Sequence, residues 1–192
     1  MSKLERDFYA NPNCAEVAHG LIGKTLVVHK PGQPKRVGRI VETEAYLGPH
    51  DLAAHSSKGV TARTQVMFGE PGYVYVYLIY GMHHCMNLVS GPVGSGSGVL
   101  LRGLEPIEGI TLPTNGPGRL CKALGITRAD YGTDACGKHI YVLDTPLALG
   151  EQVEKSPRIG VDYAGDWAHE LLRFSMKDSP YVSKPPKLKP PK

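Results

Sequence analysis

Two glutamates and a tyrosine occupy alternate positions of one short stretch, "RIVETEAYLG", residues 39–48. If the stretch is a strand, Ile40, Glu42, Glu44 and Tyr46 share one side of it. A carboxylate is rarely buried without a reason, because removing it from water is costly. A carboxylate held in a partly dry cleft can accept a proton from water or stabilise developing positive charge. The pattern is therefore a candidate catalytic site.

The same stretch has plainer interpretations. The glutamates of an edge strand would face solvent or pair with Arg36 or Arg39, and the stretch alone does not exclude this. Strand periodicity does not separate Glu42 from Glu44 as the catalytic group. A glycosidase that uses both on a sugar polymer is disfavoured, because two carboxylates on one strand face cannot readily straddle a glycosidic bond.

Aromatic residues gather in a second stretch, "YVYVYLIYGMHHCMN", residues 73–87. Tyr73, Tyr75 and Tyr77 keep the two-residue period of a strand, whereas Tyr80 breaks it just before a glycine. The pattern predicts a hairpin that turns at Tyr80–Gly81–Met82. A ring at such a tip either packs on the hairpin surface or is available to a partner.

The elements that must position these residues are predominantly strands. We expect strands at 25–30, 36–46, 73–79, 83–90, 99–106 and 139–144. We expect helices at 11–24, capped by Asn13; at 49–57, capped by Asp51; and at 115–126, 127–132 and 166–174. The glycines of "NGPG" (115–118) could hold a phosphate or serve only as a tight turn. Because helical crossovers do not separate the strands regularly, the pattern predicts an α+β domain around an antiparallel sheet.

Composition is that of an ordinary globular protein: 192 residues, 41% apolar and 21% charged, with a net charge of +4. We expect one domain, no bilayer-spanning segment, and an intracellular rather than a secreted protein. The four cysteines form no close pair, so we expect reduced thiols and neither a metal nor a cofactor. Basic residues cluster in 24–39 and in the Pro-rich 184–192, which suits a polyanion or simply a solvated face.

Taken in order, five segments resemble the alkyladenine (3-methyladenine) DNA glycosylase family: "RIVETEAYLGPHDLAAHS", "MFGEPGYVYVYLIYGMHHCMN", "VLLRGLEP", "GPGRLCKALGI" and "RIGVDYAGDWAHELLRF". The resemblance extends from about Leu4 to Ser183. It implies one compact α+β domain over residues 1–183, with a curved, mainly antiparallel sheet flanked by helices. The remaining 184–192 would be a basic, disordered tail.

The resemblance implies a monofunctional DNA glycosylase of base excision repair. Such an enzyme flips alkylated or deaminated purines out of duplex DNA and hydrolyses the N-glycosidic bond by direct water attack, leaving an abasic site. Glu44 matches the catalytic carboxylate. Arg102 matches the residue that holds Glu44 and the water, and the backbone carbonyl of Ile159 matches a further water contact. No lysine occupies a matched catalytic position, so we expect no Schiff base and no strand cleavage.

For the flipped base, the resemblance implies a pocket of five residues. Tyr46, His55 and Tyr77 would sandwich the base, and electron-rich rings attract the positive charge that alkylation often confers. Asn87 matches a position that excludes normal guanine by crowding its amino group. Leu100 matches an apolar pocket wall.

For the duplex, the resemblance makes Tyr80 the wedge that fills the gap left by the flipped nucleotide. Met82 would press against neighbouring bases or backbone. Arg63 and Met67 match phosphate contacts, although "TARTQVMFG" lacks the arginine and proline that some members carry there. We expect a monomer that binds damaged duplex DNA in the cytoplasm, nucleoid or nucleus. The alternative is a non-catalytic module that stacks unpaired bases on sheet tyrosines.

Overall fold

One curled antiparallel sheet forms the framework of the computed structural model, which describes residues 1–183. The predicted tail at 184–192 lies outside the described residues. The strand order is β3-β4-β5-β2-β1-β6, while β8 pairs with β2, and β7 with β8. The strands are β1 (Thr25–Val28), β2 (Arg36–Tyr46), β3 (Val74–Ile79), β4 (His83–Ser90), β5 (Ser97–Glu108), β6 (Ile140–Leu143), β7 (Val153–Ser156) and β8 (Arg173–Met176).

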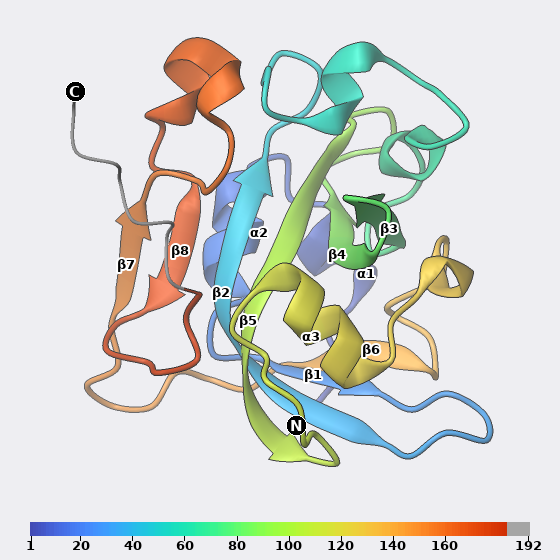
Figure 1. The fold of residues 1–192 in the computed structure, drawn as a ribbon, viewed down its shortest axis with the longest axis vertical. Helices are drawn as coiled ribbons and strands as arrows, with labels where there is room; N and C mark the ends of the chain where they lie inside the picture. Colours follow the sequence, from blue (N-terminus) through green and yellow to red (C-terminus); the bar gives the residue numbers. More distant parts are fainter. Residues whose placement is uncertain (184–192) are drawn as a thin grey trace.

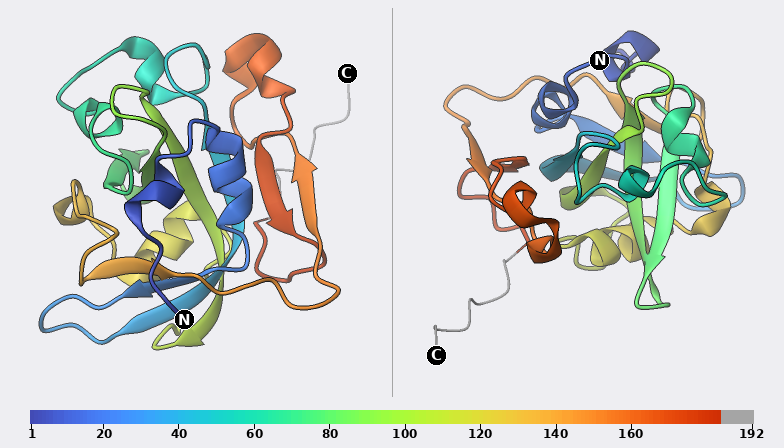
Figure 2. Two further views of the ribbon diagram at one scale, coloured as in Figure 1. Left: turned by 180° about the vertical axis from the view of Figure 1, so that it is seen from behind. Right: turned by 90° about the horizontal axis from the view of Figure 1, so that it is seen from above.

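Short helices flank this sheet, which confirms the predicted α+β class. Helix α2 contacts β2 and β5 on one side, and α3 contacts β4 and β5 on the other (Figures 1 and 2). Asn13 caps α2 as predicted, accepting the N–H groups of Ala15 and Glu16. The helices are α1 (Arg6–Tyr9), α2 (Cys14–Gly20), α3 (Pro117–Leu124) and the 3₁₀ segments η1 (His55–Lys58), η2 (Gln65–Phe68), η3 (Arg128–Asp130) and η4 (Asp162–Ala168).

Strand β2 lies inside the sheet, which excludes the edge-strand interpretation of its glutamates. Its register against β5 shifts at three points, because the register skips Val41 of β2 and both Arg102 and Ile107 of β5. The bulge at Val41 interrupts the predicted alternation. Ile40 and Val41 both join the main apolar core, and Ile40 therefore does not simply continue the row of Glu42 and Glu44.

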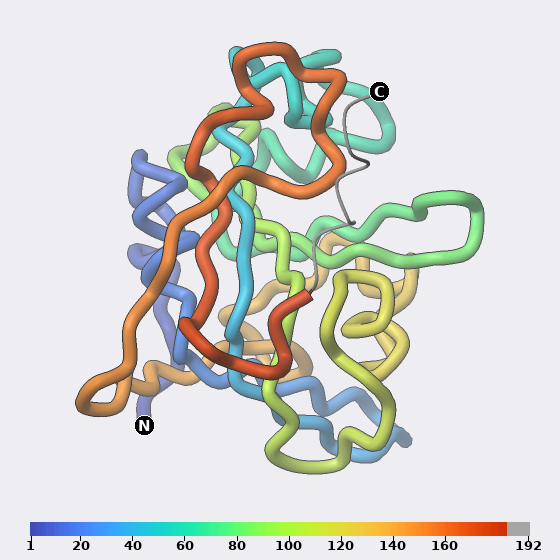
Figure 3. Tube along the Cα trace, turned by 60° about the vertical axis from the view of Figure 1, so that its left-hand side comes forward, coloured from blue at the N-terminus to red at the C-terminus, as the bar shows by residue number. Residues whose placement is uncertain are grey.

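The tyrosine hairpin forms as predicted. Strands β3 and β4 project from the body of the molecule and end in an exposed turn (Figures 2 and 3). Tyr80 and Gly81 have φ angles of 52° and 68°, and the Met82 N–H donates to the Ile79 carbonyl over 3.2 Å. Two successive positive φ angles are typical of tight hairpin turns, but only the glycine adopts one without strain.

Two predicted helices are wrong in part. The helix expected at 49–57 begins only at His55, because Asp51 caps a loop by accepting the Leu47 and Ala53 N–H groups. The helix expected at 166–174 ends at Ala168, and Arg173 begins β8 instead. Pairing with β2 and β7 outweighs the local helical pattern there. Strand β7 was not predicted.

The cysteines are free thiols, as expected, and Cys14, Cys85 and Cys121 are buried. Burial raises the pKa of Cys85 to about 11, so this thiol stays protonated at neutral pH. Across residues 1–183, no cluster of three or more His, Cys, Asp or Glu residues could bind a metal ion. The helices of this same part of the chain are all too short or too polar to cross a bilayer.

Candidate active site

A cavity of about 280 Å³ opens beside the tyrosine hairpin. It lies between β3 and β4, the end of β2, the loop before η1 and the segment that begins η4. This volume is close to the lower limit of roughly 300 Å³ for small-molecule pockets. The predicted residues that line it are Tyr46, His55, Met67, Tyr77, Tyr80 and Asn87.

Aromatic rings form one wall of the cavity. The His55 and Tyr77 ring centroids are 4.5 Å apart, and their planes are nearly perpendicular at 79°. His55 Nδ1 lies 2.9 Å from the Tyr75 hydroxyl, which fixes the imidazole. Burial, and then the positive charge of Arg63, lowers the pKa of His55 to about 4. The imidazole is therefore neutral at physiological pH, and its ring does not repel a cation.

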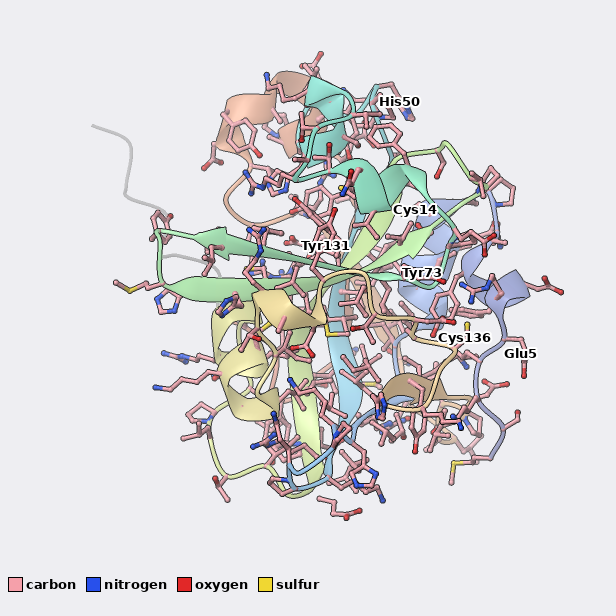
Figure 4. The ribbon with its side chains drawn as sticks, turned by 90° about the vertical axis from the view of Figure 1, so that its right-hand side faces the viewer. Glu5, Cys14, His50, Tyr73, Tyr131 and Cys136 are labelled. Atoms are coloured by element: carbon pink, nitrogen blue, oxygen red, sulfur yellow. The ribbon has the colours of Figure 1, made fainter. Side chains whose placement is uncertain are left out.

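Tyr75 also lines the cavity, although it is not among the five residues that the resemblance implied for the pocket. Because Tyr75 lies on the same strand face as Tyr77, the two-residue period could have predicted this. Tyr73 is absent from the lining: it lies at the end of the hairpin opposite the turn, whereas Tyr131 lies near the middle of the hairpin (Figure 4). The Arg6 guanidinium stacks on the Tyr73 ring at 5.1 Å. Tyr163 also lines the cavity and was not predicted.

Glu44 lies directly behind the Tyr46 wall and has no exposed surface. Its Oε2 accepts the Tyr46 hydroxyl over 2.9 Å and Arg102 Nη1 over 3.4 Å. Its Oε1 accepts the Ile159 N–H over 2.8 Å, so the backbone amide of Ile159 contacts the carboxylate directly. Burial, and then the charge of Glu44, raises the pKa of Tyr46 well above its usual value, which keeps the phenol a hydrogen-bond donor.

Glu42 is equally buried but is surrounded by fixed partners. Its Oε1 accepts Arg173 Nε over 2.6 Å, Arg102 Nε over 3.2 Å and the Ser183 hydroxyl over 2.8 Å. Its Oε2 accepts the Ser183 N–H over 2.7 Å. Glu42 is absent from the cavity lining and has no direct link to a lining ring. The structure thus separates the two glutamates that periodicity could not: only Glu44 contacts the cavity wall.

Asn87, Leu100 and Glu44 form a row across three strands, because Asn87 pairs with Leu100 and Leu100 with Glu44. Asn87 lines the cavity and donates Nδ2 to the Tyr75 carbonyl over 3.2 Å. Leu100 is only 2% exposed and lies beneath the lining residues rather than among them. The row supports the cavity floor.

The predicted DNA contacts fall in different environments. Tyr80 and Met82 at the hairpin tip are 89% and 69% exposed. Arg63 is exposed, and its guanidinium lies 5.3 Å from the centre of the Tyr77 ring. Met67 is buried at 3% exposure and its N–H donates to the Thr64 carbonyl. Its side chain therefore belongs to the cavity rather than to an outer surface.

At the glycine-rich start of α3, the Gly116 N–H is already bound within the protein. The Gly116 N–H donates to the Arg102 and Thr114 carbonyls over 2.8 and 3.1 Å. This N–H is not free to bind a phosphate. The turn interpretation of "NGPG" therefore holds for Gly116.

A curled antiparallel sheet, an aromatic cavity and a buried carboxylate behind its wall define a compact domain with the features of an enzyme active site. The sequence matches the family model described as "Methylpurine-DNA glycosylase (MPG)" over residues 7–180. The chain belongs to this family. It is therefore a DNA glycosylase, a hydrolase of N-glycosyl bonds, as the resemblance predicted.

Curated relatives match over nearly the whole chain. A protein of Myxococcus xanthus (strain DK1622) is 53% identical over 188 residues, which cover 97% of this chain and 96% of the relative. A protein of Legionella pneumophila (strain Corby) is 52% identical over 184 residues, covering 96% and 100% of the two chains. A protein of Anaeromyxobacter dehalogenans (strain 2CP-1 / ATCC BAA-258) is 51% identical over 185 residues, covering 96% and 87%. Each is named "Putative 3-methyladenine DNA glycosylase".

Proposed function

We propose that this chain acts in base excision repair, flipping alkylated purines out of duplex DNA and hydrolysing their N-glycosidic bond with water. The observation that carries the proposal is the buried Glu44 carboxylate, hydrogen-bonded to the Tyr46 wall of an aromatic cavity. The products are a free base and an intact strand with an abasic site. Residues 1–183 form the catalytic unit, which acts as a monomer inside the cell, where its DNA substrate is.

Recognition of the damaged base rests on the aromatic wall. Alkylation often gives a purine a positive charge, and a cation over an aromatic face gains about 0.5–2 kcal/mol. Tyr46, His55 and Tyr77 supply such faces, and the neutral His55 adds no repulsion. Asn87 at the cavity floor limits the space for the amino group of a normal guanine. The cavity therefore favours damaged bases without reading the surrounding sequence.

Hydrolysis rests on Glu44. Cleavage of the bond gives the sugar an oxocarbenium-like character, which a carboxylate stabilises while it accepts a proton from the attacking water. Arg102 and the Ile159 peptide hold the carboxylate in place. Because Glu44 has no exposed surface, the Tyr46 ring or the Ile159–Gly160 peptide has to move when a nucleotide enters. Gly160 is exposed and has a positive φ of 75°, which suits it to such a movement.

Duplex opening rests on the hairpin tip. Unstacking a base costs a few kcal/mol, and an inserted ring recovers part of that cost. Tyr80 is the wedge because its exposed ring lies at the tip of the projecting hairpin and also lines the cavity. Met82 supports the neighbouring bases, and Arg63 attracts a phosphate near the flipped nucleotide.

The function is tested by incubating the full chain with duplexes that each contain one defined lesion, such as 3-methyladenine, 7-methylguanine, hypoxanthine or ethenoadenine. We expect free alkylated base and an abasic strand that breaks only after mild alkali. A binding module would shift these duplexes in a gel without releasing base. Strand breaks that appear without alkali would contradict the single-step water mechanism.

A further inference from the structure

An ion pair that the proposed reaction does not use lies behind the Tyr46 ring. The side chains of Arg158 and Asp51 have no exposed surface. Arg158 Nη1 donates to Asp51 Oδ2 over 2.5 Å, and Nη2 to Oδ1 over 3.0 Å. Such a bidentate contact between a guanidinium and a carboxylate fixes the orientation of both groups as well as their separation.

The pair joins two segments that line the cavity. Asp51 also accepts the Leu47 and Ala53 N–H groups, each over 3.0 Å. Arg158 also donates to the carbonyls of Ala45 and Trp167, over 2.9 and 3.1 Å. The loop after β2 is thereby tied to the segment that contains η4. The cavity residues Ala53 and Val161 come from these two segments.

Arg158 is also connected to Glu44, the proposed catalytic group, through Tyr46 and Ile159. The Arg158 guanidinium carbon lies 4.8 Å from the centre of the Tyr46 ring. Arg158 is absent from the cavity lining, so it covers the ring face that is turned away from the cavity. Tyr46 donates to one oxygen of Glu44, and Ile159, the residue after Arg158, donates to the other.

Buried charges around this site are balanced. The carboxylates of Glu42, Glu44 and Asp51 face the guanidiniums of Arg102, Arg158 and Arg173. Removing one member of the Arg158–Asp51 pair leaves the other as an extra charge close to Glu44. The titratable or charged groups that face Glu44 are Glu42 and Tyr46 from β2, Tyr77 from β3, Cys85 from β4, Arg102 from β5, Arg173 from β8, and Arg158.

We propose that Arg158 and Asp51 are positioning residues of the glycosylase reaction. They hold the Tyr46 ring and the Ile159 amide against Glu44, and their mutual neutralisation keeps the charge around Glu44 balanced. This inference rests on the proposed role of Glu44. It assigns a functional effect to two residues that are absent from the cavity lining and whose side chains have no exposed surface.

Two variants separate an electrostatic role from a merely structural one. Asp51→Asn leaves a guanidinium that cannot lose its proton, whereas Arg158→Gln leaves an aspartate without its partner. Both variants break the same ion pair. An extra positive charge favours the carboxylate form of Glu44, so the acid limb of the pH–rate profile should move to lower pH in Asp51→Asn. The acid limb should move to higher pH in Arg158→Gln, and each shift should be on the order of one pH unit.

The measurement is single-turnover base release from a 7-methylguanine duplex between pH 4.5 and 8, with lesion-duplex binding measured alongside. The double variant Asp51→Asn/Arg158→Gln is balanced in charge, so its acid limb should return to the wild-type position while its rate stays low. Arg158→Lys keeps the positive charge but loses the bidentate contact to Asp51, so it should lower the rate of base release without moving the acid limb of the pH–rate profile.

The outcomes distinguish this inference from the proposed function. If the acid limbs of Asp51→Asn and Arg158→Gln move in the same direction, or if the acid limb is the same in all variants, the inferred charge balance around Glu44 is wrong. This holds even if Glu44→Gln is inactive. If Glu44→Gln releases base as fast as the wild type, the proposed function itself fails. Should either single variant not fold, the double variant and Arg158→Lys carry the test, and a displaced limb in either one would overturn the inference.

Discussion

At the residue scale, the partners around a buried side chain, rather than its residue type, give it its chemistry. Glu42 and Glu44 are both fully buried on the same strand, but one is enclosed by arginines and Ser183 whereas the other contacts a cavity wall. Sequence periodicity placed both on one face and could not choose between them. The choice depends on Ser183 and Ile159, which are more than a hundred residues away in the chain.

His55 provides a prediction on pH and stability. Its pKa is about 4 in the folded chain and about 6.5 when the imidazole is exposed to water. Above pH 6.5 neither state binds the proton, so there is no effect. Between pH 6.5 and 4 only the unfolded state binds it, so the fold loses stability as the pH falls. The loss at pH 5 should be on the order of 1–2 kcal/mol.

This loss is measured by urea unfolding at pH 7.5 and pH 5 for the wild type and His55→Gln. The variant should lose less stability on acidification than the wild type does. His139→Gln is a matched control, because His139 is exposed and should leave the difference unchanged. An equal loss in wild type and His55→Gln would show that His55 takes up its proton normally in the folded chain.

At the element scale, the hairpin turn contains a residue with a strained backbone, Tyr80, whose ring is exposed. Tyr80 has a φ of 52°, a left-handed conformation that costs a residue with a bulky side chain roughly 1–2 kcal/mol. Asparagine tolerates this conformation and is common at this position of such turns. A tyrosine there is a local conflict of the kind found at functional sites.

We therefore predict that Tyr80→Asn stabilises the chain by about 0.5–1 kcal/mol but slows excision from duplex DNA by at least about tenfold. Thermal unfolding and single-turnover base release measure the two effects. Tyr80→Phe keeps the ring and should retain both wild-type values. Excision at the wild-type rate by Tyr80→Asn would contradict the proposed role of Tyr80 as the wedge.

The elements show how far local patterns can predict this fold. Strand β2, the β3–β4 hairpin and the α2 cap follow from alternation, turn residues and Asn13, and all three are confirmed. The helix expected at 166–174 failed because β8 forms by pairing with β2. The helix expected at 49–57 begins only at His55, because the Asp51 carboxylate is bound by the Leu47 and Ala53 N–H groups and by the distant Arg158. Long-range partners of this kind leave no periodic signal.

At the scale of the whole molecule, one buried charge cluster joins distant parts of the chain. Glu42 of β2, Arg102 of β5 and Arg173 of β8 meet at Ser183, the last described residue. The cluster is joined to Glu44, because Arg102 contacts both glutamates. It links segments from residue 42 to residue 183, and no local motif predicts that these segments meet.

Glu42→Gln should therefore destabilise the chain by about 3–5 kcal/mol, because it leaves buried guanidiniums without their carboxylate. The free energy of unfolding from urea titrations measures this. Glu154→Gln on β7 is the control, since Glu154 is exposed and its replacement should stay within about 0.5 kcal/mol of the wild type. A small effect of Glu42→Gln would mean that the cluster contributes little to folding.

The most direct test of the central claim compares wild type and Glu44→Gln on a duplex with one alkylated purine. Single-turnover base release should fall by at least about 100-fold in the variant, because general-base catalysis by a side chain contributes about 10²–10⁴-fold. Binding of the same duplex should change little, since Glu44 is absent from the cavity lining. Base release by Glu44→Gln at the wild-type rate would contradict the account.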